Sequence, residues 1–265
     1  MTGEAQFDPD GPAITAADVT KKFALKGSDD GVLALQELSL AVATGEFVAL
    51  LGPSGCGKST LLRLMASLDR PTTGSVTVRG EPPAAIAARH AFGVAFQDHA
   101  LLPWLTVYEN IALPFKLAGR MPDDAAIREM IVLVGLDEFV SARPRQLSGG
   151  MRQRVSIARA LILDPEVLLL DEPFGALDAV TRRQMNIELQ RIWLRDQITT
   201  VLVTHSVDEA IFLADRVLVL SGRPGRIILE ATVPFDRPRD RSVMRSKEFH
   251  SLADELSLAL EPSED

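Results

Sequence analysis

A glycine-rich octapeptide, Gly52–Ser59, constrains the fold of this chain more than any other stretch. Its sequence is Gly-Pro-Ser-Gly-Cys-Gly-Lys-Ser, which matches the phosphate-loop pattern G-x-x-x-x-G-K-[ST]. The apolar run before it, Glu46–Leu51, is typical of a strand buried on both faces, and Ser59–Leu68 after it shows helical spacing. A strand, a glycine loop and a helix in this order predict an α/β domain that binds the phosphates of a nucleotide.

The chemistry of this loop depends on backbone amides and one cation. Glycines let the amides turn inward, and the N-terminus of the following helix adds partial positive charge. We expect Lys58 to reach the β- and γ-phosphates and Ser59 to ligate Mg²⁺. The alternative interpretation is an ordinary glycine-rich turn. The residues predicted to bind the nucleotide here are Gly52, Pro53, Ser54, Gly55, Cys56, Gly57, Lys58, Ser59 and Thr60.

Two acidic residues follow a second apolar run. Val167–Leu170 has the composition of a buried strand, and Asp171 and Glu172 come directly after it. Burying unpaired carboxylates is costly, so such a pair is expected where a strand end faces a metal or a ligand. We predict Asp171 as the acid of a Mg²⁺ site and Glu172 as a general base for an attacking water. A solvated turn before Pro173 is the alternative.

Composition and charge limit the class of protein. The 265 residues carry a formal net charge of −8, which argues against a nucleic-acid partner, since such proteins usually present a basic field. The single cysteine, Cys56, excludes internal disulfides. No apolar run approaches the roughly 18–20 residues that cross a bilayer. Met1–Pro12 has no basic or apolar segment, so we expect a short disordered lead and no signal peptide.

The order of the remaining segments predicts a mostly parallel sheet. Ile14–Phe23 and Leu38–Val42 alternate like antiparallel strands, whereas residues 98–163 are rich in helical patterns, including Asp123–Val134 before Gly135. Strands and helices then alternate, which implies parallel strands covered by helices. The further predicted strands are Ser75–Arg79, Phe92–Phe96, Thr200–Val203, Val217–Leu220 and Arg226–Val233, and the further helices are Thr181–Arg195 and Val207–Ala214.

The segment Leu147–Arg154, with the sequence Leu-Ser-Gly-Gly-Met-Arg-Gln-Arg, precedes a helical run. Ser148 is predicted to cap that helix, with the amides of Gly149 and Gly150 beside it. This is a second anion site in a part of the chain far from the phosphate loop. A purely structural helix cap is the alternative interpretation.

Together these stretches resemble the ATPase subunits of ABC transporters, over about Ile14–Val233. The resemblance implies a P-loop NTPase (RecA-like) core with a mostly parallel sheet, an antiparallel β subdomain and an inserted α-helical subdomain. The corresponding divisions are a lead at 1–12, an ATPase domain at 13–233 with its helical insertion at about 98–163, and a C-terminal part at 234–265. ATP and Mg²⁺ are the implied cofactors.

The resemblance also assigns roles to single residues. Phe23 matches an aromatic residue that stacks on adenine, although a core-facing strand residue is an alternative. Gln97 matches a glutamine that contacts Mg²⁺ and the attacking water, and otherwise is an ordinary strand-end residue. His205 matches a histidine that bonds the γ-phosphate and orients Glu172. In a head-to-tail homodimer, Ser148, Gly149 and Gly150 of one copy would meet the nucleotide of the other.

Several segments look like the nitrate, sulfonate and taurine group of bacterial importers: Leu101–Val107, Asp171–Ala179, Trp193 and Pro224–Arg226. The implied partners are two transmembrane permease subunits and, indirectly, a periplasmic or lipid-anchored substrate-binding protein, which would place the chain peripherally on the cytoplasmic face of the inner membrane. Trp104 and its leucines are interpreted either as core or as a grip on a partner helix. An exporter or lipoprotein-release ATPase, a non-transport ABC ATPase and a P-loop kinase are the alternatives.

Three further features remain. Ser67 and Ser206 stand where relatives often have Gly and Asp. Phe235–Lys247 is rich in Arg, Asp and Pro, which predicts an exposed linker. After it, the apolar spacing of Phe249, Leu252, Ala253, Leu256 and Leu260 predicts a short amphipathic helix packed on the core of its own chain.

Overall fold

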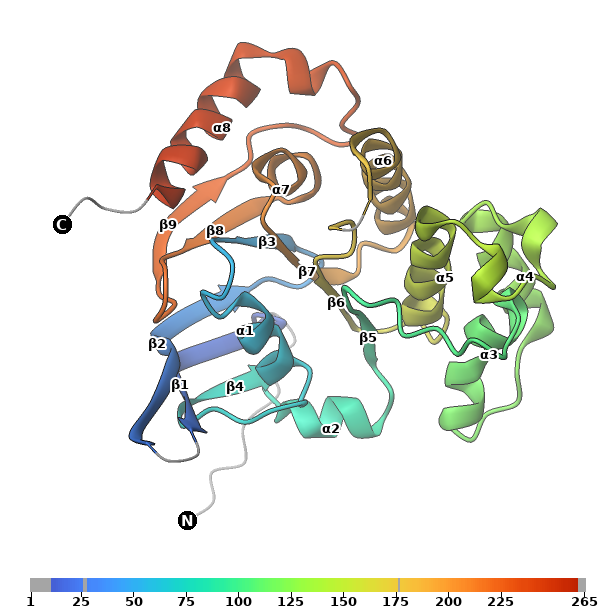
Figure 1. The fold of residues 1–265 in the computed structure, drawn as a ribbon, viewed down its shortest axis with the longest axis horizontal. Helices are drawn as coiled ribbons and strands as arrows, with labels where there is room; N and C mark the ends of the chain where they lie inside the picture. Colours follow the sequence, from blue (N-terminus) through green and yellow to red (C-terminus); the bar gives the residue numbers. More distant parts are fainter. Residues whose placement is uncertain (1–10, 26–27, 176, 262–265) are drawn as a thin grey trace.

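The structure is a computed structural model that describes residues 11–25, 28–175 and 177–261 (Figure 1). Its centre is a six-stranded sheet in the order β5-β6-β7-β3-β8-β9, in which all neighbours are parallel except β8 and β9. This confirms the predicted mostly parallel sheet. The strand bounds are β3 Phe47–Leu51, β5 Phe92–Ala95, β6 Val167–Asp171, β7 Thr199–Thr204, β8 Arg216–Leu220 and β9 Ile227–Thr232.

A separate antiparallel sheet has the order β2-β1-β4, with β1 at Ile14–Leu25, β2 at Ser28–Val42 and β4 at Thr73–Val78. Strand β2 begins ten residues before the predicted Leu38. Glu37 has a positive φ of 46°, so it interrupts the alternation of side chains that marks a strand in the sequence. The first part of β2 was therefore invisible to the pattern.

Helices cover both faces of the six-stranded sheet and extend beyond one edge (Figure 1). Along β3, Phe47, Ala49 and Leu51 pack into a core formed with the helices on one face, whereas Val48 and Leu50 pack into a second core with α1 and the antiparallel sheet. The helix bounds are α1 Lys58–Met65, α2 Pro83–Ala88, α3 Val107–Leu117, α4 Asp124–Leu133, α5 Gly149–Leu161, α6 Ala179–Asp196, α7 Val207–Leu213 and α8 Lys247–Leu260.

Local signals explain where several helices end or begin. Helix α1 ends before the predicted Leu68 because Ser67 has a φ of 61°, in the left-handed region where glycine is favoured. That conformation accounts for the glycine expected at this position. Gly135 has a φ of 64° just after α4, as predicted for a helix stop. Helices α2 and α3 were not delimited by the sequence.

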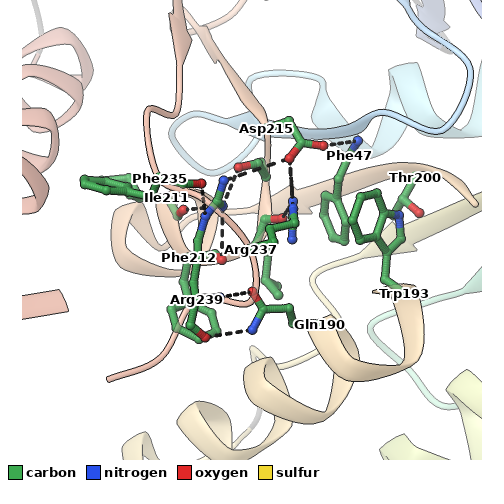
Figure 2. Close-up of polar contacts among 12 residues, drawn as sticks. Phe47, Gln190, Trp193, Thr200, Ile211, Phe212, Asp215, Phe235, Arg237 and Arg239 are labelled. Carbon is green, nitrogen blue, oxygen red and sulfur yellow. Dashed lines mark hydrogen bonds and ion pairs between the residues drawn. The ribbon is translucent and has the colours of Figure 1, made fainter. Parts of the chain in front are cut away.

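The segment after β9 corrects one prediction. Phe235–Lys247 is exposed at many positions, as predicted, but it is not a free linker. Arg239 is only 3% exposed, and its side chain donates to the carbonyls of Ile211, Phe212 and Ala214 at the end of α7 (Figure 2). The charged residues of this segment suggest solvent exposure in the sequence. In the fold, however, the N–H groups of Arg239 donate to carbonyls at a helix C-terminus that have no other partner within the helix. Helix α8 buries Phe249, Leu252 and Leu256 in the main core, as predicted.

Two predictions fall partly outside the described residues: most of the lead at 1–12, and Ala176 in the segment Asp171–Ala179. Within the described ranges, no helix has both the length and the apolar character to cross a membrane.

Candidate nucleotide site

The carboxyl ends of three adjacent parallel strands place the predicted catalytic residues side by side. Strand β3 leads into the phosphate loop, β6 ends at Asp171, and His205 follows β7. In the sheet, β7 lies between β6 and β3, so these strand ends share one edge. Such an edge is where open α/β sheets bind their ligands.

The phosphate loop has the conformation that its glycines were expected to permit. Gly57 caps α1 with a φ of 109°, and a side chain there would lie 2.8 Å from the carbonyl oxygen of Ala34. No side chain caps α1, which leaves the amides of its first turn for a ligand. The Lys58 side chain is 4% exposed, and its Nζ donates to the carbonyls of Gly52 (2.7 Å) and Pro53 (3.0 Å).

Cys56 contributes backbone rather than side chain to the loop. Its thiol is 1% exposed and its Sγ lies 3.9 Å from Lys58 Nζ, beneath the loop. Any contact of Cys56 with a phosphate therefore falls to its main chain.

A cavity of about 280 Å³ opens beside the loop. Phe23 is 40% exposed and lines this cavity, with Lys21 Nζ 4.9 Å from its ring centre, so the core-facing alternative for Phe23 is wrong. A loop of inward amides next to an exposed aromatic ring fits a nucleotide. The remaining lining residues are Val32, Ala34, Ser54, Gly55, Gly57, Lys58, Ser59, Thr60, Glu172 and Arg223, of which the sequence had not indicated Val32, Ala34 and Arg223.

Two side-chain oxygens meet beside the phosphate loop. Ser59 Oγ donates to Asp171 Oδ1 at 2.8 Å, which confirms that the two residues predicted for a metal lie together. Burial raises the pKa of Asp171, and the hydrogen bond from Ser59 opposes that shift. A hydroxyl and a carboxylate are hard oxygen donors, the type that Mg²⁺ takes beside nucleotide phosphates. The residues present therefore fit this ion.

Glu172 stands at the end of β6 in a strained conformation. Its φ is 45°, and its amide donates to the carbonyl of Val203 on β7. His205 Nδ1 lies 3.2 Å from Glu172 Oε2, so the predicted pair is in contact. Gln97 is exposed, and its amide nitrogen and the Glu172 carboxylate both lie close to Gly175. Strain at a reacting carboxylate is a common feature of functional sites.

A network behind His205 was not predicted. Thr204 Oγ1 donates to the buried carboxylate of Glu209, and it accepts from the amide of Ser206 at 3.0 Å. Ser206 Oγ caps α7 by accepting from the Glu209 amide, which an Asp at this position would also do. The spacing Ser-x-x-Glu at a helix start was the available signal. Burial raises the pKa of Glu209.

The signature segment lies apart from this cavity. Ser148 is exposed and caps α5, accepting from the Met151 amide at 3.2 Å, as predicted. Gly150 is buried, and a side chain there would lie 2.9 Å from Thr181. Ser148, Gly149 and Gly150 do not line the nucleotide cavity; Ser148 and Gly150 line a second one of about 250 Å³.

Comparisons with known proteins agree with this geometry. Residues 35–175 match the ABC transporter family. The nitrate import ATP-binding protein NrtD of Synechocystis sp. is 45% identical over 255 residues, which cover 93% of this chain and 94% of the relative. The aliphatic sulfonates import ATP-binding protein SsuB 1 of Burkholderia cenocepacia is 45% identical over 244 residues, 92% of this chain and 70% of the relative.

Solved structures carry the same conclusion. The dimeric structure of MJ0796, described as a bacterial ABC transporter cassette, aligns with a TM-score of 0.73 at 33% identity and covers 84% of this chain and 100% of that chain. A post-hydrolysis structure of the same cassette, bound to ADP and Pi, aligns equally well at 31% identity. The strand-edge site, the family match and these cassettes together show that the chain belongs to the ABC transporter family, as an ATP-binding subunit that hydrolyses ATP.

Proposed function

We propose that this chain powers the import of a small solute of the nitrate, sulfonate or taurine type through membrane subunits. The observation that carries the proposal is a group of relatives at 45% identity named for nitrate import, bicarbonate transport and aliphatic sulfonate import. These names favour import over export or lipoprotein release. They also favour transport over a non-transport ATPase.

In the proposed site, the phosphate loop and Lys58 hold the β- and γ-phosphates, and Phe23 stacks on the adenine. Ser59 and Asp171, already 2.8 Å apart, would hold Mg²⁺ together with Gln97. When bound, the ion neutralises phosphate charge as it develops in the transition state.

Glu172 would accept the proton of the attacking water. His205 fixes the position of that carboxylate, because its Nδ1 lies 3.2 Å from Glu172 Oε2. The Thr204, Ser206 and Glu209 contacts hold the start of α7 and so support the histidine. A base that is held in place before the reaction loses little entropy on reaching the transition state.

The second half of each site would come from another copy of the chain. Ser148 is exposed at the N-terminus of α5 and lies outside the nucleotide cavity of its own chain, which suits a contact with the nucleotide of a partner. The dimeric cassette relative supports this arrangement. We propose a head-to-tail homodimer in which Ser148, Gly149 and Gly150 face the partner's γ-phosphate.

Two permease subunits would dock beside the helical subdomain, for which we propose the bounds 98–163. Trp104 is 64% exposed, so the interpretation of this residue as core is wrong. A mainly apolar cavity of about 410 Å³ lies between β5, α3 and α5, with Phe92, Leu113 and Ala160 in its wall. Exposed apolar surface of this kind fits a helix of a membrane subunit. The chain would thus sit on the cytoplasmic face of the membrane, and a substrate-binding protein would act from the other side.

The substitution Glu172→Gln tests the catalytic part. The variant should bind ATP and form a stable dimer, and its turnover should fall by about 10²–10⁴-fold, the range for loss of a general base. Glu255→Gln on the exposed face of α8 is the matched control. If the Glu172 variant still hydrolyses ATP, Glu172 is not the general base.

A separate experiment tests the transport part. Uptake of nitrate, taurine and an alkanesulfonate is measured in a strain that lacks the gene, with and without the wild-type chain. Restored uptake of one of them is expected. If none is restored while a secreted compound accumulates inside the cells, the import proposal is wrong.

A further inference from the structure

The turn between β8 and β9 contains Pro224–Arg226, a segment that the resemblance singled out without giving it a role. It is a rigid turn. The Ser221 amide donates to the Arg226 carbonyl at 2.9 Å, and the Arg226 amide donates to Ser221 Oγ at 3.1 Å. Ser221 Oγ also lies 3.1 Å from the Pro224 carbonyl.

The same turn is fixed against the phosphate loop. The Gly225 amide donates to the Ala34 carbonyl at 2.9 Å, and the Gln36 amide donates to the Gly225 carbonyl at 3.1 Å. A side chain at Gly225 would lie 2.2 Å from the carbonyl oxygen of Cys56, so only glycine permits this approach. The turn is therefore wedged between strand β2 and the backbone of the phosphate loop.

This anchoring sets the position of Arg223, two residues before Gly225. Arg223 is exposed at the surface and lines the nucleotide cavity. The wall of this cavity also contains Phe23 and Val32 from the antiparallel sheet and Ser54 and Gly55 from the phosphate loop. Arg223 thus shares one cavity with the aromatic ring expected to stack on the base and with the loop expected to hold the phosphates.

The net charge of the chain and the cations in the cavity wall both bear on nucleotide binding. The chain has a formal net charge of −8, so its overall field opposes the approach of a nucleotide. In the described part of the cavity wall, the cationic side chains are Lys58 and Arg223, and Lys58 Nζ is already bonded to two loop carbonyls. Among the residues that the structure describes, no carboxylate forms an ion pair with Arg223.

We propose that Arg223 is a nucleotide-binding residue that donates to the phosphate oxygens of ATP and ADP. The inference rests on the nucleotide site proposed above and adds a contact that the phosphate-loop pattern does not contain. A planar guanidinium matches phosphate oxygens in geometry, and its charge strengthens each hydrogen bond. Arg223 therefore helps the site to select charged nucleotides over the uncharged nucleoside.

The test compares Arg223→Ala, Arg223→Gln and Arg223→Lys with Arg226→Ala, which removes an exposed arginine of the same turn that is not in the cavity wall. Dissociation constants for ADP and for adenosine are measured by calorimetry, and the KM for ATP is measured in steady state. Arg223→Ala and Arg223→Gln should raise the ADP dissociation constant and the KM about three- to ten-fold, the size of one charge-assisted bond at an exposed site. The loss should appear in KM rather than in kcat, and it should shrink at high salt.

The other arms decide the outcome. Arg223→Lys should recover most of the affinity, and Arg226→Ala should change it less than two-fold. Unchanged ADP affinity in Arg223→Ala, while Lys58→Ala abolishes binding, overturns this inference and leaves the nucleotide site intact. An equal loss for adenosine and ADP overturns the phosphate contact, because it places the guanidinium on the base. If Lys58→Ala also binds normally, the proposed nucleotide site itself is wrong.

Discussion

In the six-stranded sheet, polar residues at the carboxyl ends of the parallel strands (the carboxyl edge) have different surroundings from those at the amino ends (the amino edge). At the carboxyl edge, Glu172 lines the nucleotide cavity, Asp171 accepts a hydrogen bond from Ser59, and His205 contacts Glu172. At the amino edge, Asp215, Arg237 and Arg239 are bonded to the ends of strands and helices (Figure 2). The same strands form both edges, so the difference lies in the groups that surround the side chains at each end.

The amino edge is closely bonded. Asp215 accepts from the amide of Phe47 at 2.9 Å and from Arg237 Nε at 2.9 Å. The Nη1 atom of Arg237 has no hydrogen-bond acceptor among the described residues. The guanidinium lies 4.2 Å from the centre of a Trp193 ring, and this cation–π contact compensates in part for the missing hydrogen bond. The Arg239 side chain donates to three carbonyls at the end of α7. Its backbone N–H and C=O form two hydrogen bonds with the side-chain amide of Gln190. Burial lowers the pKa of Arg239 to about 10, so it stays charged at neutral pH.

At the carboxyl edge, several polar groups are in environments that cost folding free energy. Burial raises the pKa of Asp171 and of Glu209, Glu172 has a φ of 45°, and Glu209 Oε1 is buried without a partner among the described residues. A folded protein retains such groups when they act on a ligand. Burial opposes the charged form at both edges, but at the amino edge the arginines donate to backbone carbonyls that need partners, so we expect their bonds to contribute more to stability than those at the carboxyl edge.

The largest effect on stability is expected at the amino edge. Arg239→Met should lower the free energy of unfolding by about 3 kcal/mol, because three buried carbonyls lose their donors. Urea unfolding monitored by circular dichroism measures it. Arg241→Met, an exposed arginine two residues further on, should change stability by less than about 0.5 kcal/mol. Equal effects of the two substitutions would show that the arginine cluster is not a stabilising element.

A smaller effect of opposite sign is expected at Asp171. Its folded pKa is raised by burial, so the folded protein binds this proton more tightly than the unfolded chain. Stability is therefore lost as pH rises from the ordinary carboxyl value, 3.8, through the raised one. Asp171→Asn removes that loss and should raise the thermal midpoint at pH 7.5 in the absence of nucleotide and divalent cations. The difference from wild type should disappear near pH 3.5, and a wild type that is more stable at pH 7.5 would contradict the burial argument.

The smallest effect concerns backbone strain at Glu172. Glu172→Gly and Glu172→Ala both remove the carboxylate, but only glycine adopts a φ of 45° without strain. We expect the glycine variant to be more stable than the alanine variant by about 1 kcal/mol, with hydrolysis lost in both. Parallel urea titrations measure the difference. An alanine variant as stable as the glycine variant would mean that this position stores no strain.

Much of the site could be predicted because its signals are local. The phosphate loop, the Asp171 and Glu172 pair and the cap at Ser148 are each recognisable within a few residues, and their strand or helix ends were confirmed. The contacts of Arg239, Glu209 and Arg223 were missed. Arg239 is 25 residues from its partner Ala214, and the Arg223 turn packs on a loop almost 170 residues earlier, so no local pattern reports either contact.

The sequence by itself determined the family, the order of most strands and helices, and the residues at the strand ends, because periodicity and motif spacing act along the chain. Only the tertiary structure decided which charged residues are buried and which face a ligand. Seen as sequence, Arg223 and Arg239 are alike: both are arginines beside prolines in the last part of the chain. The fold bonds one to helix carbonyls and places the other in the wall of the nucleotide cavity, because burial and charge pairing depend on segments that meet only when the sheet assembles.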